Sequence, residues 1–133
     1  ELSNDTDAAA LAYAVIEGVS FGLADGMRAL QAAGCDVKQL SLVGGGARSA
    51  LWAQQLATLL NINIVTHEES AAGGALGAAR LGWLATGAAV DDVCLAPKIS
   101  KTYKPDAEEL KILAPRYARF RAIYPALKAI QKI

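Results

Sequence analysis

The sequence predicts an α/β fold in which two parallel strands are flanked by helices. The apolar segment Leu40–Val43 ends in three glycines and is followed by a helical segment, Ala50–Leu60. A second short segment, Ile62–Thr66, is rich in β-branched residues and follows that helix directly. Two strands joined by a helix lie parallel, with a right-handed crossover. Because a parallel pair needs both faces covered and further strands beside it, we expect this pair to belong to a larger sheet.

The first helix is predicted over residues 8–32. Large apolar residues recur every four positions and form a ridge: Leu11, Val15, Val19, Leu23 and Met27. Small residues recur with the same spacing and form a groove: Ala10, Ala14, Gly18, Gly22 and Gly26. Each glycine inside a helix costs about 0.5–1 kcal/mol relative to alanine. We therefore expect another element, either the sheet or the third helix, to pack closely along this groove, and Gly34 to end the helix.

Local signals mark the ends of the next two helices. Ser49 is the expected N-cap of the helix that follows the first strand, and Asn61 is its expected stop. A third helix is predicted over residues 74–86, where small and apolar residues continue without a break. The expected boundaries of this third helix are Ser70 or Gly73 at its start and Gly87 at its end.

The C-terminal third is predicted to contain a connection and two helices. Lys98–Pro105 has the composition of an irregular connection. Asp106 and Glu109 resemble a capping box for a short helix, with Asp in place of Ser or Thr. Pro115 is expected to begin the last helix and Pro125 to kink it. The apolar face of this last helix is supplied by Tyr117, Phe120, Ile123, Tyr124 and Leu127.

The composition disfavours several classes of protein. The 133 residues suffice for one domain, and 13 basic and 13 acidic residues give a formal net charge of zero, so nucleic acid is not the expected partner. Cys35 and Cys94 are interpreted as reduced thiols of a cytoplasmic protein, with a disulfide left open. The segment Leu11–Leu30 is apolar, but a buried helix is favoured over a membrane span, because three charged residues interrupt it: Glu17, Asp25 and Arg28.

Two glycine clusters are candidates for a ligand site. The first, Gly44–Gly46, lies at a strand-to-helix junction, where the bare backbone lets a ligand approach and the helix start favours an anionic or polar partner. The second cluster lies within residues 70–80 and opens the third helix. Together they predict one cleft of nucleotide size. The alternative is that these glycines serve only tight turns and close helix packing.

Three segments give the chain a family resemblance: YAVIEGVSFGLADGMRAL, LSLVGGGARSALWAQQLA and GGALGAARLG. They resemble the C-terminal part of the FGGY carbohydrate kinases, and nearly the whole chain is covered. The form GGGARSxxW and the LADGM tail of the first helix resemble members that phosphorylate xylulose more than those that phosphorylate glycerol. The resemblance implies a ribonuclease-H-like (actin-like ATPase) domain. It also implies that residues 1–133 are a C-terminal nucleotide-binding segment of a larger two-lobed enzyme.

The resemblance also implies a division of the active site. The adenosine side of ATP would be bound here, by Gly44, Gly45, Gly46, Ala47, Arg48 and Ser49. The sugar pocket, the phosphate loop, the Mg²⁺ site and the catalytic carboxylate would lie outside this segment. We therefore assign no catalytic residue and no metal ligand in this chain, and expect it to be inactive alone. The acidic residues in its loops and termini match no catalytic motif: Asp5, Asp7, Asp91, Asp92 and Asp106.

The partners implied are a sugar, ATP and the missing N-terminal lobe, with no membrane partner. Two parallel strands leave apolar surface uncovered, so a homo-oligomer is also expected. Arg48 is open to two interpretations, a contact to phosphate or ribose and a surface role. Ordinary structural roles are favoured for five other residues: His67 as a polar strand end, Glu17 in a buried hydrogen bond, Arg80 with an exposed head, and Trp52 and Trp83 in the core.

Two other functions remain open from the residues. Gly44, Gly46 and the acidic Glu68 after the second strand follow the outline of a dinucleotide-binding module. Ser49, however, stands where that outline has its third glycine, and the long first helix has no place in it. A non-catalytic packing or dimerisation domain is the other alternative.

Overall fold

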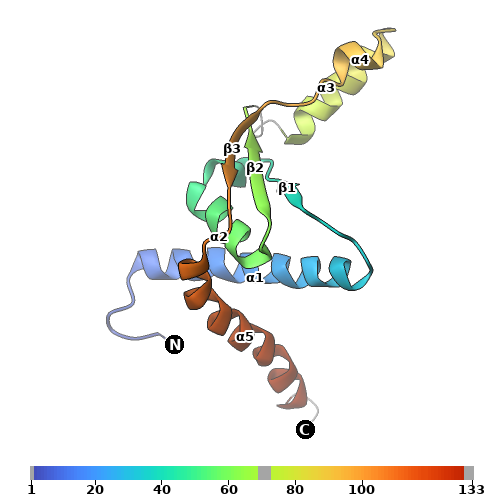
Figure 1. Cartoon of the computed structure of the whole chain (residues 1–133). Helices are drawn as coiled ribbons and strands as arrows, with labels where there is room; N and C mark the ends of the chain where they lie inside the picture. The colour runs from blue at the N-terminus through green and yellow to red at the C-terminus, as the bar shows by residue number, and fades with distance from the viewer. Residues whose placement is uncertain (1, 69–72, 131–133) are drawn as a thin grey trace.

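The computed structural model describes residues 2–68 and 73–130, arranged as Figure 1 shows. Helix α1 runs across one end of a small sheet, α3 and α4 extend beyond the opposite end, and α5 leads away past α1 (Figure 1). The elements in order are α1 (Ala8–Ala32), β1 (Gln39–Ser41), η1 (Gly45–Arg48), α2 (Ala50–Leu60), β2 (Asn63–His67), α3 (Gly73–Ala85), α4 (Val90–Val93), β3 (Ile99–Tyr103) and α5 (Ala107–Ile130).

The sheet contains the predicted parallel pair and one strand that was not predicted. The strand order is β1-β2-β3, with β1 parallel to β2 and Leu40 opposite Ile64. Strand β3 is antiparallel to β2, with Thr102 opposite Val65, so the prediction of an irregular connection over Lys98–Pro105 is wrong. Four of the five residues of β3 are exposed, which leaves no alternation of buried and exposed positions for the sequence to reveal. Its backbone pairing to β2 determines its structure instead.

The predicted helix ends are confirmed for α1 and α2. Ser49 Oγ accepts a hydrogen bond of 3.2 Å from the backbone N–H of Trp52, and Asn61 ends α2 in the left-handed conformation with φ 53°. Gly34 follows α1 with φ 89°, where glycine carries no steric penalty. The N–H groups of Gly34 and Cys35 both donate to carbonyls of the last turn of α1. This is a Schellman ending, and it turns the chain toward β1.

The helices after β2 differ from the prediction in two respects, since the short helix α4 was not expected and α5 is longer than expected. Helix α3 begins at Gly73, and Ser70, the other predicted start, lies outside the described residues. Where two helices were expected, α5 is a single helix that continues through Pro115 and Pro125. Pro115 removes one backbone hydrogen bond from the helix, and Leu113, two residues earlier, is the fully buried residue of this turn. The prediction that Pro115 begins a helix is therefore wrong.

The start of α5 is fastened to α2 by a polar cluster. Asp106 Oδ1 accepts from the backbone N–H groups of Glu108 and Glu109, at 2.8 and 3.1 Å. The Glu109 carboxylate accepts from the buried Thr58 hydroxyl at 2.6 Å rather than returning to Asp106. Half of the predicted capping box therefore forms, and its other half serves the contact between α5 and α2.

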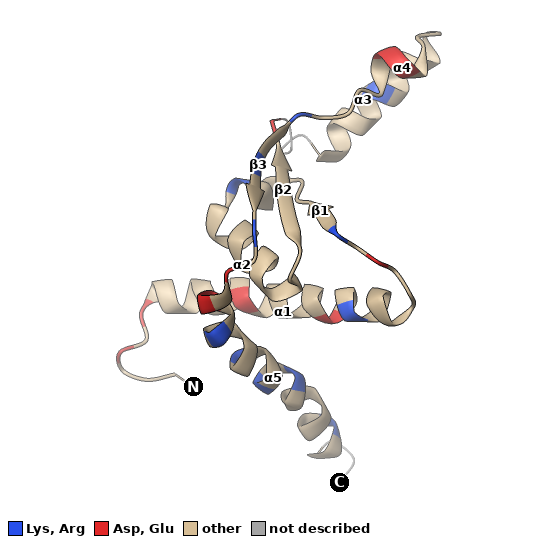
Figure 2. Ribbon diagram, viewed as in Figure 1, with Lys and Arg blue, Asp and Glu red and all other residues tan. Residues whose placement is uncertain are grey.

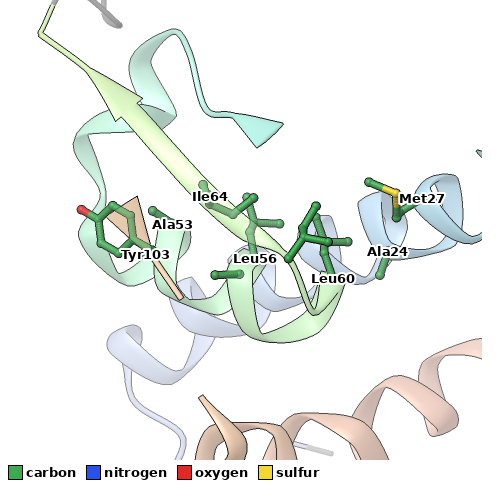
Figure 3. Packing of buried hydrophobic residues seen from close by; sticks show 9 residues of the cluster. Ala24, Met27, Ala53, Leu56, Leu60, Ile64 and Tyr103 are labelled. Atoms are coloured by element: carbon green, nitrogen blue, oxygen red, sulfur yellow. The ribbon is translucent and has the colours of Figure 1, made fainter. Parts of the chain in front are cut away.

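Apolar residues of α1, α2, β2 and β3 form the core (Figure 3). Helix α2 lies between the sheet and α1, and supplies the largest share of these residues. The core therefore fixes the position of α2 and of the turn that leads into it. The members of the cluster are Ala24, Met27, Ala53, Leu56, Ala57, Leu60, Ile62, Ile64 and Tyr103.

Helix α1 buries a different face from the one predicted. Its buried residues are Ser20, Phe21, Ala24 and Met27. Of the predicted ridge only Met27 is buried, and the other four residues are 48–66% exposed. A Cβ placed on Gly18, Gly22 or Gly26 would meet no described atom within 4 Å outside the helix's own backbone, so the prediction that this groove packs against the sheet or the third helix is wrong here. The hydrogen bonds of Ser20 and the packing of Met27 turn the other face of α1 toward α2.

The glycine groove instead borders hollows. Gly22 and Gly26 line an apolar hollow of about 380 Å³ together with side chains of β1 and α2. Among the described residues α1 is the one helix that is long and apolar enough, by length and composition alone, to cross a membrane. Four of its 25 residues are buried, so the expectation of a buried helix holds for one face only.

Helix α5 crosses α1 at a seam of charged and aromatic residues. Figure 2 shows Lys and Arg spread along α5, and Asp and Glu on α1. Arg116 pairs with Glu17 at 2.9 Å, so Glu17 makes a structural contact, but the hydrogen bond is exposed and not buried as predicted. The Tyr117 hydroxyl donates to Asp25 at 2.6 Å, and Phe21 packs against its ring at a centroid distance of 5.4 Å. Burial and this hydrogen bond raise the pKa of Tyr117 to about 12, and the Glu17 carboxylate raises the pKa of Arg116.

Candidate functional site

The candidate site is the turn between β1 and α2. Gly44 leaves the strand with φ 82° and ψ −167°, a conformation that a side chain would strain. The short 3-10 helix η1 follows, and the N–H of Ala47 donates to the Gly44 carbonyl at 3.1 Å. Ser49 closes the turn by donating its N–H to the Gly46 carbonyl at 3.0 Å and by capping α2. The turn therefore directs its backbone along the N-terminal end of α2, where the helix dipole favours negative charge.

The three glycines of this turn have different surroundings. Gly45 is exposed, and a Cβ placed on it would meet no described atom within 4 Å. A Cβ on Gly46 would lie 2.0 Å from Trp52 Cζ3, so a side chain cannot be placed there without moving the indole. The turn therefore has one side supported by Trp52, and one residue whose backbone is open to a ligand.

The second glycine cluster lies beside the first at its start. A Cβ on Gly73, which has φ 47°, would be 3.8 Å from the Gly44 Cα. The beginning of α3 and the end of β1 are thus neighbours, as one shared site requires. The rest of the cluster diverges, since a Cβ on Gly74 or Gly77 would meet no described atom within 4 Å outside the helix's own backbone. Gly45 and Gly74 are both exposed, so the described residues leave the space between the two clusters open.

Trp52 is held by a polar cluster that sequence reasoning missed. Its indole Nε1–H donates to Ser20 Oγ at 3.0 Å. The Ser20 hydroxyl is fully buried and lies 2.8 Å from both the Ile16 carbonyl and Gln55 Oε1, so its single hydrogen serves one of them at a time. Gln55 Nε2 donates to the Tyr13 hydroxyl at 3.2 Å. The sequence carries only a weak signal for it, a serine and a glutamine among the apolar residues of two helices that also hold other polar residues. Buried polar groups occur where they have partners.

The other predicted residues are distributed as follows. Arg48 is exposed and has no hydrogen bond or ion pair with any described residue, so both of its interpretations remain open. His67 ends β2, and its Nε2 lies 2.9 Å from Ser41 Oγ at the end of β1, which confirms its role as a polar strand end. Arg80 Nη2 donates to the Leu95 carbonyl. Trp52 is half-buried against the core, whereas Trp83 is 56% exposed, so the core interpretation of Trp83 is wrong in this chain.

Metal ligation and disulfide formation have no support in the part of the chain described. No group of three or more His, Cys, Asp or Glu residues within residues 2–68 and 73–130 could hold a metal ion. Cys35 and Cys94 are both free and exposed, in agreement with the interpretation as thiols. What the described residues offer is a backbone surface at a helix N-terminus. Its chemistry suits binding rather than bond breaking.

Comparisons with known proteins show which protein family this chain resembles. The family model for the C-terminal domain of the FGGY family of carbohydrate kinases matches residues 1–86. The xylulose kinase of Escherichia coli (strain K12) is 38% identical over 119 residues, which are 88% of this chain and 25% of that protein. The crystal structure of a xyloylose kinase from Brucella ovis has a TM-score of 0.79 at 43% identity, over 97% of this chain and 27% of that one.

A structure of a gluconate kinase from Lactobacillus acidophilus is also similar, with a TM-score of 0.67 at 25% identity, over 96% of this chain and 26% of that one. This chain therefore spans about a quarter of the length of the relatives it matches. The antiparallel strand β3 departs from the all-parallel outline of a dinucleotide-binding module. The resemblance predicted from the segments around GGGARSALW is confirmed, and the chain belongs to the FGGY family of carbohydrate kinases.

Proposed function

We propose that the protein containing this segment transfers the γ-phosphoryl group of MgATP to D-xylulose, giving D-xylulose 5-phosphate. The xylulose kinases among its relatives support this reaction and this sugar. The segment is proposed to be the C-terminal nucleotide-binding part of a ribonuclease-H-like domain. The same relatives support a cytoplasmic location. Residues of the missing N-terminal lobe, and a second copy of the chain, are the proposed protein partners.

The adenosine side of ATP is proposed to lie on the turn Gly44–Ser49. The observation that carries this proposal is the open backbone of Gly45 beside the N-terminus of α2, with Gly73 of the second cluster next to Gly44. Ligand sites contain a small number of placed polar groups, and the backbone N–H and C=O groups of this turn can supply such contacts to a base and a ribose. The exposed Arg48 guanidinium is positioned on the same turn for an anionic or hydroxyl group of the nucleotide.

The role of this segment is to bind and orient the nucleotide. Phosphoryl transfer depends on positioning and on stabilising charge at the γ-phosphate, and Mg²⁺ supplies much of that charge when bound. Carboxylates for the metal and a base for the sugar hydroxyl are proposed to come from the rest of the protein, because the described acidic residues form no such group. This segment then fixes one end of ATP so that its other end reaches the sugar.

The proposal is tested by Gly45→Val in the intact protein. Because Gly45 has ordinary backbone geometry and open surroundings, valine fits the fold and occupies only the space assigned to the nucleotide. We expect the KM for ATP to rise by about tenfold or more while the KM for D-xylulose changes by less than about twofold. Gly82→Val on α3, also at an exposed glycine, is the control and should leave both unchanged. An unchanged KM for ATP in folded Gly45→Val protein would remove this turn from the ATP site.

Gly46→Val is a poorer test of the same site, although the glycine motif first suggests it. Its side chain would collide with Trp52 whether or not a nucleotide binds. A loss of ATP binding in that variant would therefore report on the turn's own packing as much as on the ligand.

A further inference from the structure

We infer that Trp52 is a positioning residue for the nucleotide: its indole, held by Ser20, sets the conformation of the glycine-rich turn through its contact with Gly46. The inference rests on the proposed function, in which the turn binds the adenosine side of ATP. Trp52 itself need not touch the nucleotide, since it acts through the backbone of the turn.

The contact between Trp52 and Gly46 leaves no room for a side chain. A Cβ on Gly46 would lie 2.0 Å from Cζ3, 2.6 Å from Cε3 and 3.2 Å from Cη2 of the indole. The edge of the six-membered ring therefore lies directly against the Gly46 backbone. Since packed interiors resist even small changes of volume, the ring position and the turn position are coupled.

The orientation of the indole is fixed from its other end. The Nε1–H donates to Ser20 Oγ at 3.0 Å, and Ser20 is fully buried on α1. Gln55, which is 1% exposed, lies 2.8 Å from the same hydroxyl and extends the cluster to Tyr13. A rotation of the ring away from Gly46 would leave buried polar groups without partners, which costs free energy. Trp52 is therefore held in the one orientation that supports the turn.

The same arrangement links the candidate site to α1. Ser49 Oγ, which caps α2, accepts the backbone N–H of Trp52, so this residue contacts the turn through both its main chain and its side chain. Gly45, one residue before Gly46, has open surroundings. The support is thus confined to one side of the turn, and the other side stays available to the ligand. If Trp52 only filled the core, its loss would not change the KM for ATP without also changing the KM for D-xylulose.

The test is a compensation experiment in the intact protein. Gly46→Ala introduces the clash, and we expect the KM for ATP to rise by about tenfold or more with the KM for D-xylulose changed by less than about twofold. Trp52→Leu removes the ring atoms that the new Cβ meets. Combined with Gly46→Ala, it should return the KM for ATP most of the way to that of Trp52→Leu alone. Trp83→Leu combined with Gly46→Ala is the matched control and should give no rescue.

Two results would overturn the inference. One is a double variant whose rise in the KM for ATP equals the product of the rises in the two single variants. The other is a rise of the KM for ATP and the KM for D-xylulose together, which a general packing defect would produce. If Gly46→Ala does not yield folded protein, Trp52→Phe decides, because phenylalanine lacks both the indole ring atoms that lie against Gly46 and the Nε1–H that bonds to Ser20. A KM for ATP raised by about two- to fivefold with an unchanged KM for D-xylulose supports the inference, and an unchanged KM for ATP rejects it.

This experiment separates the inference from the proposed function. Gly45→Val reports on whether the nucleotide lies on the turn, and it does not involve Trp52. If Gly45→Val raises the KM for ATP but the rescue fails, the proposed site stands and the role of Trp52 is wrong. If Gly45→Val has no effect, the proposed site is wrong whatever the rescue shows.

Discussion

Glycines recur in the turn after β1 and on one face of α1, and of these two regions only the turn has glycines that the described residues explain. Gly44 has a positive φ of 82°, Gly46 lies against Trp52, and Gly45 is open. On α1, a Cβ at Gly18, Gly22 or Gly26 would meet no described atom outside the helix's own backbone. Local geometry thus accounts for Gly44 and Gly46, two of the three glycines of the turn. The glycine face of α1 has no reason within the described residues, and its small residues border hollows instead of neighbours.

The difference shows how a repeated small residue should be interpreted. A glycine needed for a turn shows its reason in its own φ angle or in a close neighbour. A glycine stripe on a helix costs stability and is useful where another element approaches. The chain spans about a quarter of the length of its relatives, so we expect the face of α1 that carries the stripe to be covered in the intact protein.

The largest expected effect concerns catalytic activity. It tests whether the glycine-rich turn, which forms within this chain alone, is sufficient for phosphoryl transfer. We expect residues 1–133 alone, incubated with MgATP and D-xylulose, to form no sugar phosphate above background. Holding only the adenosine end of ATP leaves the γ-phosphate without positioning or charge stabilisation. The measurement is a coupled assay of ADP release with the intact protein as the positive control. Turnover at rates typical of kinases would show that a catalytic carboxylate lies within these residues.

Stability measurements can test whether the glycine-rich turn is packed in this chain while the glycine face of α1 is not. In this chain alone, Gly46→Val should lower the free energy of unfolding by about 1–3 kcal/mol or more, because the indole must move. Gly22→Leu should cause no loss in the same chain, and should cost about 1–3 kcal/mol in the intact protein. Urea unfolding of Gly46→Val and Gly22→Leu, each in the isolated chain and in the intact protein, gives the four changes in the free energy of unfolding. A loss for Gly22→Leu in the isolated chain would mean that the groove is already packed.

The smallest expected effect concerns the seam between α1 and α5. Unlike the glycine face of α1, this seam has both of its sides within the described residues. The folded-state pKa of Tyr117 is raised from its ordinary value of 10 to about 12, first by burial and then by its bond to Asp25. The stabilisation that it contributes is complete below pH 10 and is lost as the pH rises from 10 through 12. Melting temperatures measured between pH 9 and 12 should therefore fall less steeply for Tyr117→Phe than for the wild type. Parallel curves for the two proteins would contradict the assigned cause.

The sequence predicts best those elements whose signals are local. The bounds of α1 and α2, the cap at Ser49 and the stop at Asn61 all follow from side chains within the same turn. The parallel pairing of β1 and β2 follows from the helix between them. Strand β3 was not predicted, because its pairing to β2 spans a long stretch of sequence and four of its five residues are exposed. The continuation of α5 through Pro115 was not predicted either, because proline is the usual local signal of a helix start or end.

The turn that forms the candidate site was predicted from the sequence, whereas the side chains that support the turn were not. The motif GGGARS gives the turn and its cap, because glycine and serine have well-defined local roles there. The contact of Gly46 with Trp52 joins residues six apart, across the cap that separates the turn from α2. Ser20 and Gln55 are 35 residues apart in sequence and meet only because α1 and α2 pack together. Tertiary packing therefore supplies what the spacing of residues cannot.

The position of β3 has a consequence for how the protein is made on the ribosome. This strand comes late in the chain, yet it pairs with β2, which lies between β1 and β3 in the sheet. Until residues 99–103 have been synthesised and have left the exit tunnel, the backbone of β2 presents an unpaired row of N–H and C=O groups on that side. Unpaired strand edges promote aggregation of nascent chains. A premature stop codon just before residue 99 should therefore harm solubility more than one just after residue 103, although the two products differ only by the five residues of β3.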